Sequence, residues 1–307
     1  MLRLTCCRAS LIAFLATLAS LWSVLAAAPG YAADSPTGGS IYAKENLAAW
    51  CIVPFDASRR GPVERAQMLN RLGLTKLAYD WRDEHIPTFE TEILTLREHG
   101  IEFFAFWSPA SQNPGYQAMM KLLEQHAIHP RIWMIAPNAE AGSQEERVKV
   151  NAEAMLPFVR DAKRLGCRFA LYNHGGWSGE PDNLIAMVRW LRENVPVDDV
   201  GIVYNFHHGH EHLPRFPAAF QRMVPYLTCV NLNGMTVGGA KILPVGEGKE
   251  DRRMLEMIRD SGYSGPIGVL DHRGEIDAEK SLRENLSGMK RLLGEMGDTD
   301  AANSYGP

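Results

Sequence analysis

Short apolar runs recur along the chain and are separated by longer stretches of mixed polarity. The runs are nearly continuous rather than alternating, which is typical of strands buried on both faces of a parallel sheet. Eight such runs occur, at 48–55, 75–80, 101–107, 131–136, 168–173, 200–207, 227–233 and 266–272. The pattern therefore predicts eight strands in one parallel sheet.

The stretches between these runs have the 3.6-residue period of amphipathic helices. They lie at 63–72, 87–99, 116–126, 145–165, 181–193, 216–223, 251–261 and 277–296. Gly73, Gly100 and Gly166 precede strands in the way that helix C-terminal stops do. Eight strand–helix units in about 260 residues predict a single (β/α)8 TIM barrel, of the α/β class. A doubly wound open sheet is the alternative, but no glycine-rich dinucleotide turn follows the first strand.

The N-terminus differs from the rest of the chain. Arg3 and Arg8 precede an apolar run at 10–28, and Gly30 and Ala32 supply small residues before a cleavage point. This pattern predicts a signal peptide and export to the periplasm or the extracellular space, with an uncleaved membrane anchor as the alternative. The expected divisions are a signal peptide at 1–32, a linker at 33–46, the barrel at 47–297 and a disordered tail at 298–307.

Composition and charge narrow the class of partner. The 307 residues are 46% hydrophobic and 22% charged, which is typical of a globular protein. Formal net charge is −4, and removal of Arg3 and Arg8 with the signal peptide would make it −6. A nucleic-acid partner is not expected, because phosphate contact requires positive potential. We expect a small-molecule carbohydrate partner and no membrane contact after cleavage; no oligomeric state is indicated.

Three cysteines remain beyond the predicted signal peptide, namely Cys51, Cys167 and Cys229. Their odd number and wide spacing do not form a disulfide framework, and no Cys-x-x-Cys pair indicates zinc. We expect small buried side chains.

Polar residues gather where the predicted strands end. In a TIM barrel the carboxyl ends of the strands and the loops after them carry the chemistry. Six of the ten histidines lie there, which is the strongest sequence signal for a functional site. They are His174, His207, His208, His210, His212 and His272.

Imidazole exchanges protons near neutral pH, so these histidines are candidate acids and bases. His174 precedes two glycines and is predicted to be a general base or a ligand of sugar hydroxyls; a histidine that orders its loop is the alternative. Because side chains alternate along a strand, at least one of His207, His208 and His210 is expected to face away. His208 is preferred and His210 is second.

Carboxylates and amides complete the candidate site. Asp271 and Glu247 are candidate catalytic carboxylates, and Asp271 could pair with His272. The amides are predicted to bind sugar hydroxyls, or else to bond one another and loop backbone. Tryptophans at strand ends could stack on a sugar ring. The candidate substrate-binding residues are Asn173, Trp177, Asn205, His210, Asn231, Asn233, His272, Trp107, Asp80 and His85.

Four segments carry a resemblance to a known superfamily. They are Leu-Tyr-Asn-His-Gly-Gly-Trp at 171–177, Gly-Ile-Val-Tyr-Asn-Phe-His-His at 201–208, Leu-Pro-Val-Gly-Glu-Gly at 243–248 and Ser-Gly-Tyr-Ser-Gly-Pro-Ile-Gly-Val at 261–269. On these segments the chain resembles the xylose-isomerase-like TIM barrels, the superfamily of sugar isomerases and epimerases. The secreted chain looks like a branch found beside carbohydrate-processing proteins.

The resemblance implies a divalent metal (Mn, Mg or Zn) held by Glu, Asp, His and Glu at the ends of strands five to eight. Here Tyr172, Asn205, Asn231 and Asp271 stand at those positions, while His208 matches a histidine of the strand-six pattern. Neutral amides are weak ligands for such cations, so we expect a degraded metal site. A site rebuilt from His174, His208, His210 and Asp271 is the alternative.

The resulting hypothesis is an exported sugar-active enzyme that transfers a proton next to the carbonyl of a sugar or keto-sugar. The reaction would be of isomerase, epimerase, lyase or hydratase type. His174 would carry protons together with His208 or Asp271. The alternative is a non-catalytic carbohydrate-binding barrel that has lost its metal site.

Overall fold

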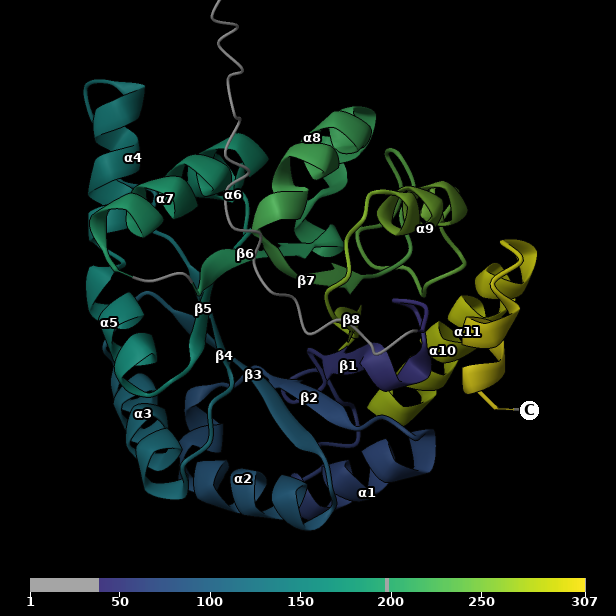
Figure 1. Cartoon of the computed structure of the whole chain (residues 1–307). Helices are drawn as coiled ribbons and strands as arrows, with labels where there is room; N and C mark the ends of the chain where they lie inside the picture. Colours follow the sequence, from purple (N-terminus) through teal and green to yellow (C-terminus); the bar gives the residue numbers. More distant parts are fainter. Residues whose placement is uncertain (1–38, 197–198, 307) are drawn as a thin grey trace, which may run out of the picture. The chain divides into compact units, whose positions relative to one another are not determined.

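Eight parallel strands close into a barrel in the order β1 to β8 in the computed structural model, which describes residues 39–196 and 199–306 (Figure 1). Pairing of β1 with β8, through Ala49 and Val269, closes the ring. All eight predicted strands are confirmed. Strand β1 ends at Trp50, five residues before its predicted end, and each of the other strands ends within two residues of its predicted end. The strands are β1 (Leu47–Trp50), β2 (Lys76–Tyr79), β3 (Glu102–Pro109), β4 (Arg131–Ile135), β5 (Arg168–Tyr172), β6 (Val200–Asn205), β7 (Leu227–Leu232) and β8 (Ile267–Leu270).

Helices surround the barrel and connect successive strands (Figure 1). The eight helical stretches predicted from the sequence all contain helices. The α-helices are α1 (Pro62–Leu72), α2 (Phe89–Glu98), α3 (Pro114–His126), α4 (Gln144–Glu153), α5 (Leu156–Arg164), α6 (Gly176–Gly179), α7 (Pro181–Asn194), α8 (Phe216–Met223), α9 (Asp251–Asp260), α10 (Ala278–Glu295) and α11 (Thr299–Ser304). Short 3-10 segments are η1 (Lys44–Asn46), η2 (Asp83–Thr88), η3 (Phe206–His208), η4 (His210–Arg215) and η5 (Val224–Tyr226).

The stretch at 145–165 is two helices rather than the single helix that its periodicity predicts. Helix α4 ends at Glu153, and α5 begins at Leu156 with Pro157 in its first turn. The ring of a proline clashes with the carbonyl four residues earlier, which here belongs to Glu153. Pro157 is therefore tolerated at the start of α5 and ends α4.

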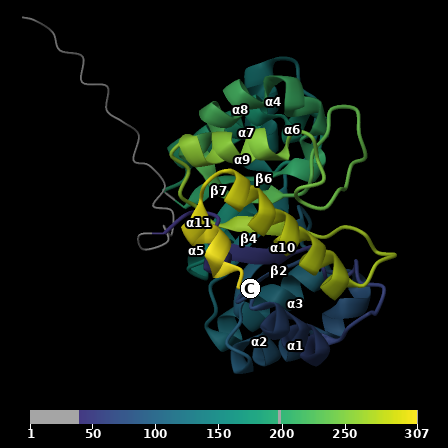
Figure 2. The same ribbon diagram turned by 90° about the vertical axis from the view of Figure 1, so that its right-hand side faces the viewer.

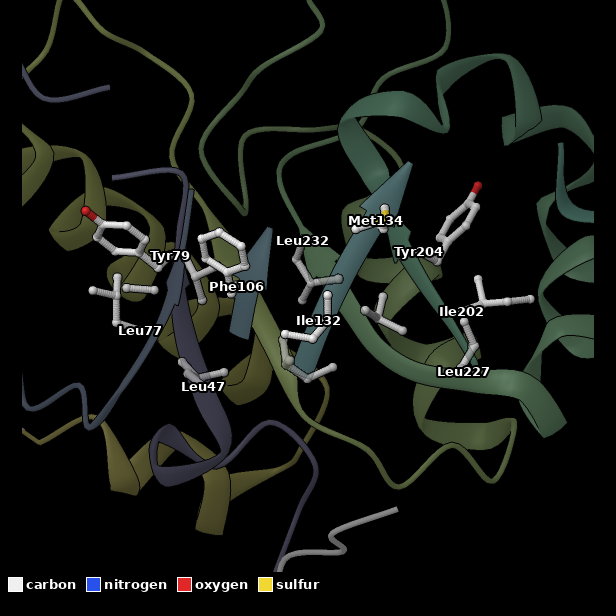
Figure 3. Packing of buried hydrophobic residues seen from close by; sticks show 14 of the residues in the cluster. Leu47, Leu77, Tyr79, Phe106, Ile132, Met134, Ile202, Tyr204, Leu227 and Leu232 are labelled. Carbon is white, nitrogen blue, oxygen red and sulfur yellow. The ribbon is translucent and has the colours of Figure 1, made fainter. Parts of the chain in front are cut away.

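Alternation along the strands divides the apolar side chains into two layers. Strand residues such as Leu47, Leu77, Ile132 and Ile202 pack against the helices in the larger cluster (Figure 3). A second cluster consists of strand residues with no helix residue among them, including Trp50, Ala78, Phe104, Trp133 and Tyr172. This second cluster fills the barrel interior, so inward-facing residues at the carboxyl end of each strand form the mouth.

Both ends of the described chain contain more structure than the sequence predicts. Tyr42, in the predicted linker, is fully buried, and its hydroxyl donates a hydrogen bond of 2.8 Å to the carbonyl of Leu255. The predicted disordered tail is wrong for 299–306: α11 lies beside α10 (Figure 2) and buries Ala301. Asp298 caps α11, and the Tyr305 hydroxyl donates to the carbonyl of Tyr42 at 2.9 Å. These contacts order two terminal segments whose polar sequences do not predict buried residues.

The predicted signal peptide lies outside the described residues. Within the described ranges, no helix combines the length and the apolar character that crossing a bilayer requires.

Candidate functional site

A cavity of about 70 Å³ lies at the carboxyl ends of the strands, the end at which the sequence places the site. Six strands contribute to its walls. The lining residues lie in or just after β1, β2, β3, β5, β6 and β8. The lining residues are Trp50, Cys51, Phe55, Asp80, Arg82, Trp107, Tyr172, His174, Asn205, His207, His208 and His272.

Four histidines form a continuous row along one side of this cavity. The ring centroids of His174 and His208 are 4.3 Å apart, those of His208 and His207 are 4.4 Å apart, and those of His207 and His272 are 4.9 Å apart. The His272 ring also contacts Phe55, with centroids 3.8 Å apart. Loops after three different strands therefore bring four imidazoles to one place.

Of the three histidines of which at least one was expected to face away, His207 and His208 line the cavity and His210 does not. Strand alternation would nevertheless not place two consecutive residues on the same side. Strand β6 ends at Asn205, and residues Phe206–His208 form the 3-10 helix η3. Asn205 starts this turn, because its Oδ1 accepts a hydrogen bond of 3.0 Å from the amide of His207. A 3-10 turn does not alternate its side chains between two faces, so neighbouring histidines can share the mouth.

Burial keeps these imidazoles neutral. It lowers the pKa of His174 and His272 below the ordinary value. The pKa of His207 falls to about 4 through burial and then the neighbouring His272. Burial and then His174 lower the pKa of His208 to about 2. At pH 7 each ring therefore presents one nitrogen that accepts a proton and one that donates a hydrogen bond.

A phenol and an amide lie beside the imidazoles. The Asn205 Nδ2 donates a short hydrogen bond to the hydroxyl of Tyr172, which leaves the hydroxyl's own hydrogen free to donate. Burial raises the pKa of Tyr172 well above its ordinary value, so the phenol stays protonated. The Tyr172 ring lies 5.8 Å from that of His208, measured between centroids. Tyr172 thus supplies a neutral hydrogen-bond donor at the cavity wall.

The other three strand-end amides do not line the cavity. Asn173 is fully buried: its Oδ1 accepts from the amide of Asn205 at 2.6 Å and its Nδ2 donates to the carbonyl of Asn205 at 3.1 Å. Asn233 donates to the carbonyl of Lys241 at 3.3 Å and holds the loop after β7. Asn231 faces the barrel interior opposite Gly268, where an added Cβ would collide with its amide. These three amides are placed to order the backbone and the interior.

Two predicted catalytic carboxylates also lie elsewhere. Asp271 is fully buried but points to α10, where its Oδ1 accepts a hydrogen bond of 2.6 Å from the Ser281 hydroxyl. Leu270 occupies an inward position of β8, and the alternation of side chains continues here and turns the next residue outward. Glu247 is exposed in the loop before α9, and its Oε1 is 3.7 Å from Nη2 of Arg291. The structure brings neither carboxylate to the cavity.

Three predicted substrate-binding side chains are used in loop contacts. The Nε2 of His210 lies 3.0 Å from the carbonyl of Lys241. The amide of Arg82 donates to Nδ1 of His85 at 2.8 Å. Trp177, on α6, donates to Gln144 at 3.1 Å beneath the guanidinium of Arg147. Of the predicted binding residues, Asp80, Trp107, Asn205 and His272 do line the cavity.

Sequence reasoning missed the contribution of the segment after β1. Cys51 is buried, as predicted for all three described cysteines, but it lines the cavity and has a left-handed backbone with φ of 62°. This turn places Trp50 and Cys51 together in the inner cluster, so alternation fails here as well. Burial raises the thiol pKa of Cys51 well above its ordinary value, and the group stays a neutral thiol. A positive φ at a non-glycine residue has no signal in the sequence.

The residues at the expected metal positions do not fit a divalent cation. Tyr172 and Asn205 are neutral and bonded to each other, Asn231 is neutral, and Asp271 points away. Such cations require anionic oxygen or convergent imidazole and carboxylate ligands. His210 and Asp271 do not join His174 and His208. Across the described part of the chain, no group of three His, Cys, Asp or Glu side chains has the geometry to hold a metal ion.

The closed parallel barrel is a (β/α)8 TIM barrel, and its fold is similar to those of solved TIM barrels, among them a xylose isomerase-like TIM barrel protein from Mycobacterium smegmatis. Three solved structures illustrate the similarity. The IolI protein with a bound zinc atom is 12% identical over 81% of this chain and 98% of its own, with a TM-score of 0.63. The 3-keto-D-glucoside 4-epimerase YcjR from E. coli is 14% identical over 82% and 100%, with a TM-score of 0.60. The probable 3-DHS dehydratase AsbF from Bacillus anthracis is 14% identical over 80% and 98%, with a TM-score of 0.59.

No protein-family model and no curated protein matches the chain. At these identities the similarity to solved structures concerns the fold.

Proposed function

We propose that this protein is an exported sugar-active enzyme that moves a proton at a carbon next to the carbonyl of a sugar or keto-sugar. The observation that carries the proposal is the row of four neutral imidazoles at the barrel mouth, beside the hydroxyl of Tyr172. The reaction is of isomerase or epimerase type, or of lyase or hydratase type. The named activities of YcjR, an epimerase, and AsbF, a probable dehydratase, support this range.

The histidines divide into a base and a donor. His174 is the most exposed of the four histidines, and its partly desolvated ring is in contact with that of His208. We assign His174 as the base that takes a proton from the carbon, and it becomes an imidazolium. The electron pair forms a carbon–carbon double bond, and negative charge develops on the carbonyl oxygen. His208, whose low pKa keeps it neutral, donates a hydrogen bond to that oxygen, as a neutral imidazole can.

Tyr172 and Asn205 act on the same developing charge. The Asn205 amide fixes the Tyr172 hydroxyl, so that its hydrogen can point to the oxygen. Donors that are held in place before the reaction stabilise a developing oxyanion without reorganisation. When the hydroxyl proton of the enediolate moves to the charged oxygen and His174 returns its proton to the neighbouring carbon, the product is an isomer with the carbonyl moved by one carbon. Transfer of the His174 proton to a departing hydroxyl, which leaves as water while the charged oxygen becomes a carbonyl again, gives a lyase. These steps use imidazole, phenol and amide groups of this chain.

Solvent deuterium exchange tests the proposal directly. The purified protein is incubated in deuterium oxide with a panel of aldoses, ketoses and keto-glycosides, and exchange at carbon is followed by NMR. We expect exchange and product formation with at least one sugar. His174→Ala and His208→Ala should each lower the rate by about 10²- to 10⁴-fold, the usual contribution of a positioned proton carrier.

His126→Ala is the matched control, since His126 pairs with Glu90 on the helix surface at 2.8 Å. It should leave the rate unchanged. Binding of a sugar with no exchange would instead identify a non-catalytic carbohydrate-binding barrel. Full exchange in both cavity variants would overturn the assignment of the site.

Export is a separate part of the proposal, supported by the charged and apolar pattern at 1–32. N-terminal sequencing of the protein recovered from cell fractions tests it. We expect the mature chain outside the cytoplasm and beginning at Ala33. A cytoplasmic chain that keeps residues 1–32 would contradict export.

A further inference from the structure

The cationic side chain in the lining of the cavity with the four histidines is Arg82. It follows β2, and its side chain is 46% exposed, so the guanidinium lies at the rim. The cavity volume of about 70 Å³ is far below the roughly 300 to 1,000 Å³ that is usual for small-molecule sites. A space of this size holds only part of a monosaccharide, and the remainder extends to the rim. Arg82 is therefore placed to contact the part of a bound sugar that lies outside the cavity.

Two contacts fix the guanidinium of Arg82 and leave one of its edges free. Its Nη1 donates a hydrogen bond of 2.6 Å to the carbonyl of Trp81, and its Cζ lies 5.4 Å from the centroid of the Phe55 ring. The Oδ2 of Asp80 is 3.8 Å from the same Nη1, which is too far for a hydrogen bond. Nε and Nη2 form no hydrogen bond with the described residues. These two nitrogens make up one edge of the guanidinium, and such an edge matches the two oxygens of a carboxylate.

The charged side chains with the largest effects on the imidazole row are cationic. Burial lowers the pKa of His272, and the charge of Arg82 adds to this effect. Burial and neighbouring imidazoles lower the pKa of His207 and His208, and the charge of the exposed Lys241 lowers both further. The net charge of the whole chain is −4, so this positive surrounding is local to the mouth. A cleft bordered by charges of one sign attracts a ligand of the opposite sign, here an anion.

We propose that Arg82 binds a carboxylate group of the substrate, and that the substrate is a sugar acid. This inference rests on the proposed function, which brings the reacting carbon to His174. Arg82 and His272 both contact the ring of Phe55, whose centroid is 5.4 Å from the Cζ of Arg82 and 3.8 Å from the centroid of the imidazole. One aromatic ring therefore separates the guanidinium from the imidazole row, so that both can contact one monosaccharide.

A carboxylate is the anion that the free edge of Arg82 matches. Its two oxygens lie in one plane and accept two parallel hydrogen bonds, one from Nε and one from Nη2. Such a pair fixes the direction of the bound molecule as well as its position. A hydroxymethyl group offers one oxygen and no charge, so a neutral sugar gains less from the same edge. Arg82 thus selects acids over neutral sugars and directs the carbonyl-bearing part of the acid to the imidazoles.

Pairs of sugars that differ in a carboxylate test the inference. Binding of aldonates, uronates and keto-aldonates, and of the neutral sugar that matches each acid, is measured by isothermal titration calorimetry. We expect at least one acid to bind about 10-fold or more tightly than its neutral counterpart, with an affinity that falls as salt is added. Arg82→Gln should lower the affinity for this acid by about 10- to 100-fold and change that for the neutral sugar by less than about twofold. Arg82→Lys keeps the charge and loses the paired donors, so its affinity for the acid should lie between the two.

Arg59→Gln is the matched control, since Arg59 is an exposed arginine in the loop after β1 and lines a separate cavity of about 680 Å³. It should keep the affinities of the wild type, and melting curves check the fold of each variant. Equal affinity for acids and neutral sugars would overturn the inference, and so would acid binding that Arg82→Gln does not weaken. Tighter binding of a sugar phosphate through Arg82 would overturn the choice of a carboxylate.

The deuterium exchange assay separates this inference from the proposed function. Arg82-dependent binding of an acid without exchange at carbon would confirm the carboxylate site and refute the proposed reaction. Exchange with neutral sugars and no preference for acids would support the reaction and overturn the carboxylate site.

Discussion

The ends of β2 and β8 carry the same residue in the same position and use it in opposite ways. Asp80 directly follows the last residue of β2, and Asp271 directly follows the last residue of β8. Tyr79 packs outward against the helices, so Asp80 turns inward; Leu270 packs inward, so Asp271 turns outward. The two strands differ by one residue in which positions face inward. As a result the Asp80 carboxylate lines the cavity, and the Asp271 carboxylate lies against α10.

The comparison also shows that a perturbed pKa does not by itself mark a catalytic group. Burial raises the pKa of Asp80 to about 6 and that of Asp271 to about 7. Asp271 nevertheless receives hydrogen bonds from the Ser281 hydroxyl and the Arg273 amide. The face on which each side chain lies determines its surroundings: Asp80 lines the cavity, whereas Asp271 is hydrogen-bonded to α10 and to the loop after β8.

Asp271→Asn should give the largest effect on stability. The folded pKa of about 7 lies above the value of about 3.9 in an unfolded chain. Between these values the folded state binds a proton that the unfolded state has released, so wild-type stability falls as pH rises through this window. Asparagine does not titrate, so the stability of the Asp271→Asn variant does not fall for this reason as the pH rises. The free energy of unfolding of the variant relative to wild type should increase by about 2 to 4 kcal/mol from pH 4 to pH 8.

Urea denaturation at pH 4, 6 and 8 measures this difference. A difference that does not change with pH would mean that Asp271 titrates normally. Asp271 and Asp80 would then differ in the direction in which their side chains point.

Much of this arrangement could be predicted from the sequence, because it depends on averages over several residues. Eight apolar runs define eight strands, and the periodic stretches between them define the helices. The gathering of His174, His208 and His272 at one end follows from the parallel direction of the strands. Proline chemistry could also have located the break between α4 and α5, since Pro157 excludes a continuous helix.

The errors concern single residues, where one residue of phase decides the outcome. Asp271 was predicted at the mouth because a pattern of apolar residues sets the strand but not which of two neighbouring positions faces inward. His207 joins His208 because η3 replaces strand geometry after Asn205. Cys51 joins Trp50 through a left-handed backbone. Each depends on local dihedral angles that tertiary packing selects.

Ser281→Ala tests the surroundings of Asp271 on the outer side of the barrel and should change the free energy of unfolding less than Asp271→Asn does. The Ser281 hydroxyl donates the 2.6 Å hydrogen bond to Asp271, and its loss leaves that buried oxygen without this donor. We expect a loss of about 1 to 2 kcal/mol in the free energy of unfolding at pH 8, with exchange and product formation unchanged.

The loss should be smaller in the Asp271→Asn background, because a neutral acceptor gains less from the hydroxyl than a carboxylate does. A double-mutant cycle measures this coupling. Independent effects of the two changes would show that Ser281 does not stabilise the carboxylate.

Glu247→Gln should give the smallest effect, because its carboxylate is exposed on the surface and is buried neither in the cavity wall nor beneath the helices. Its Oε1 is 3.7 Å from Nη2 of Arg291, and both side chains are exposed. Surface pairs of this kind contribute little, since water screens the charges and Arg291 also donates to the carbonyl of Gly246 at 2.7 Å. We expect unfolding free energy within about 0.5 kcal/mol of wild type and turnover within about twofold, measured by urea denaturation and by the exchange assay. A large loss of turnover without a loss of stability would mean that the loop before α9 reaches the mouth during the reaction.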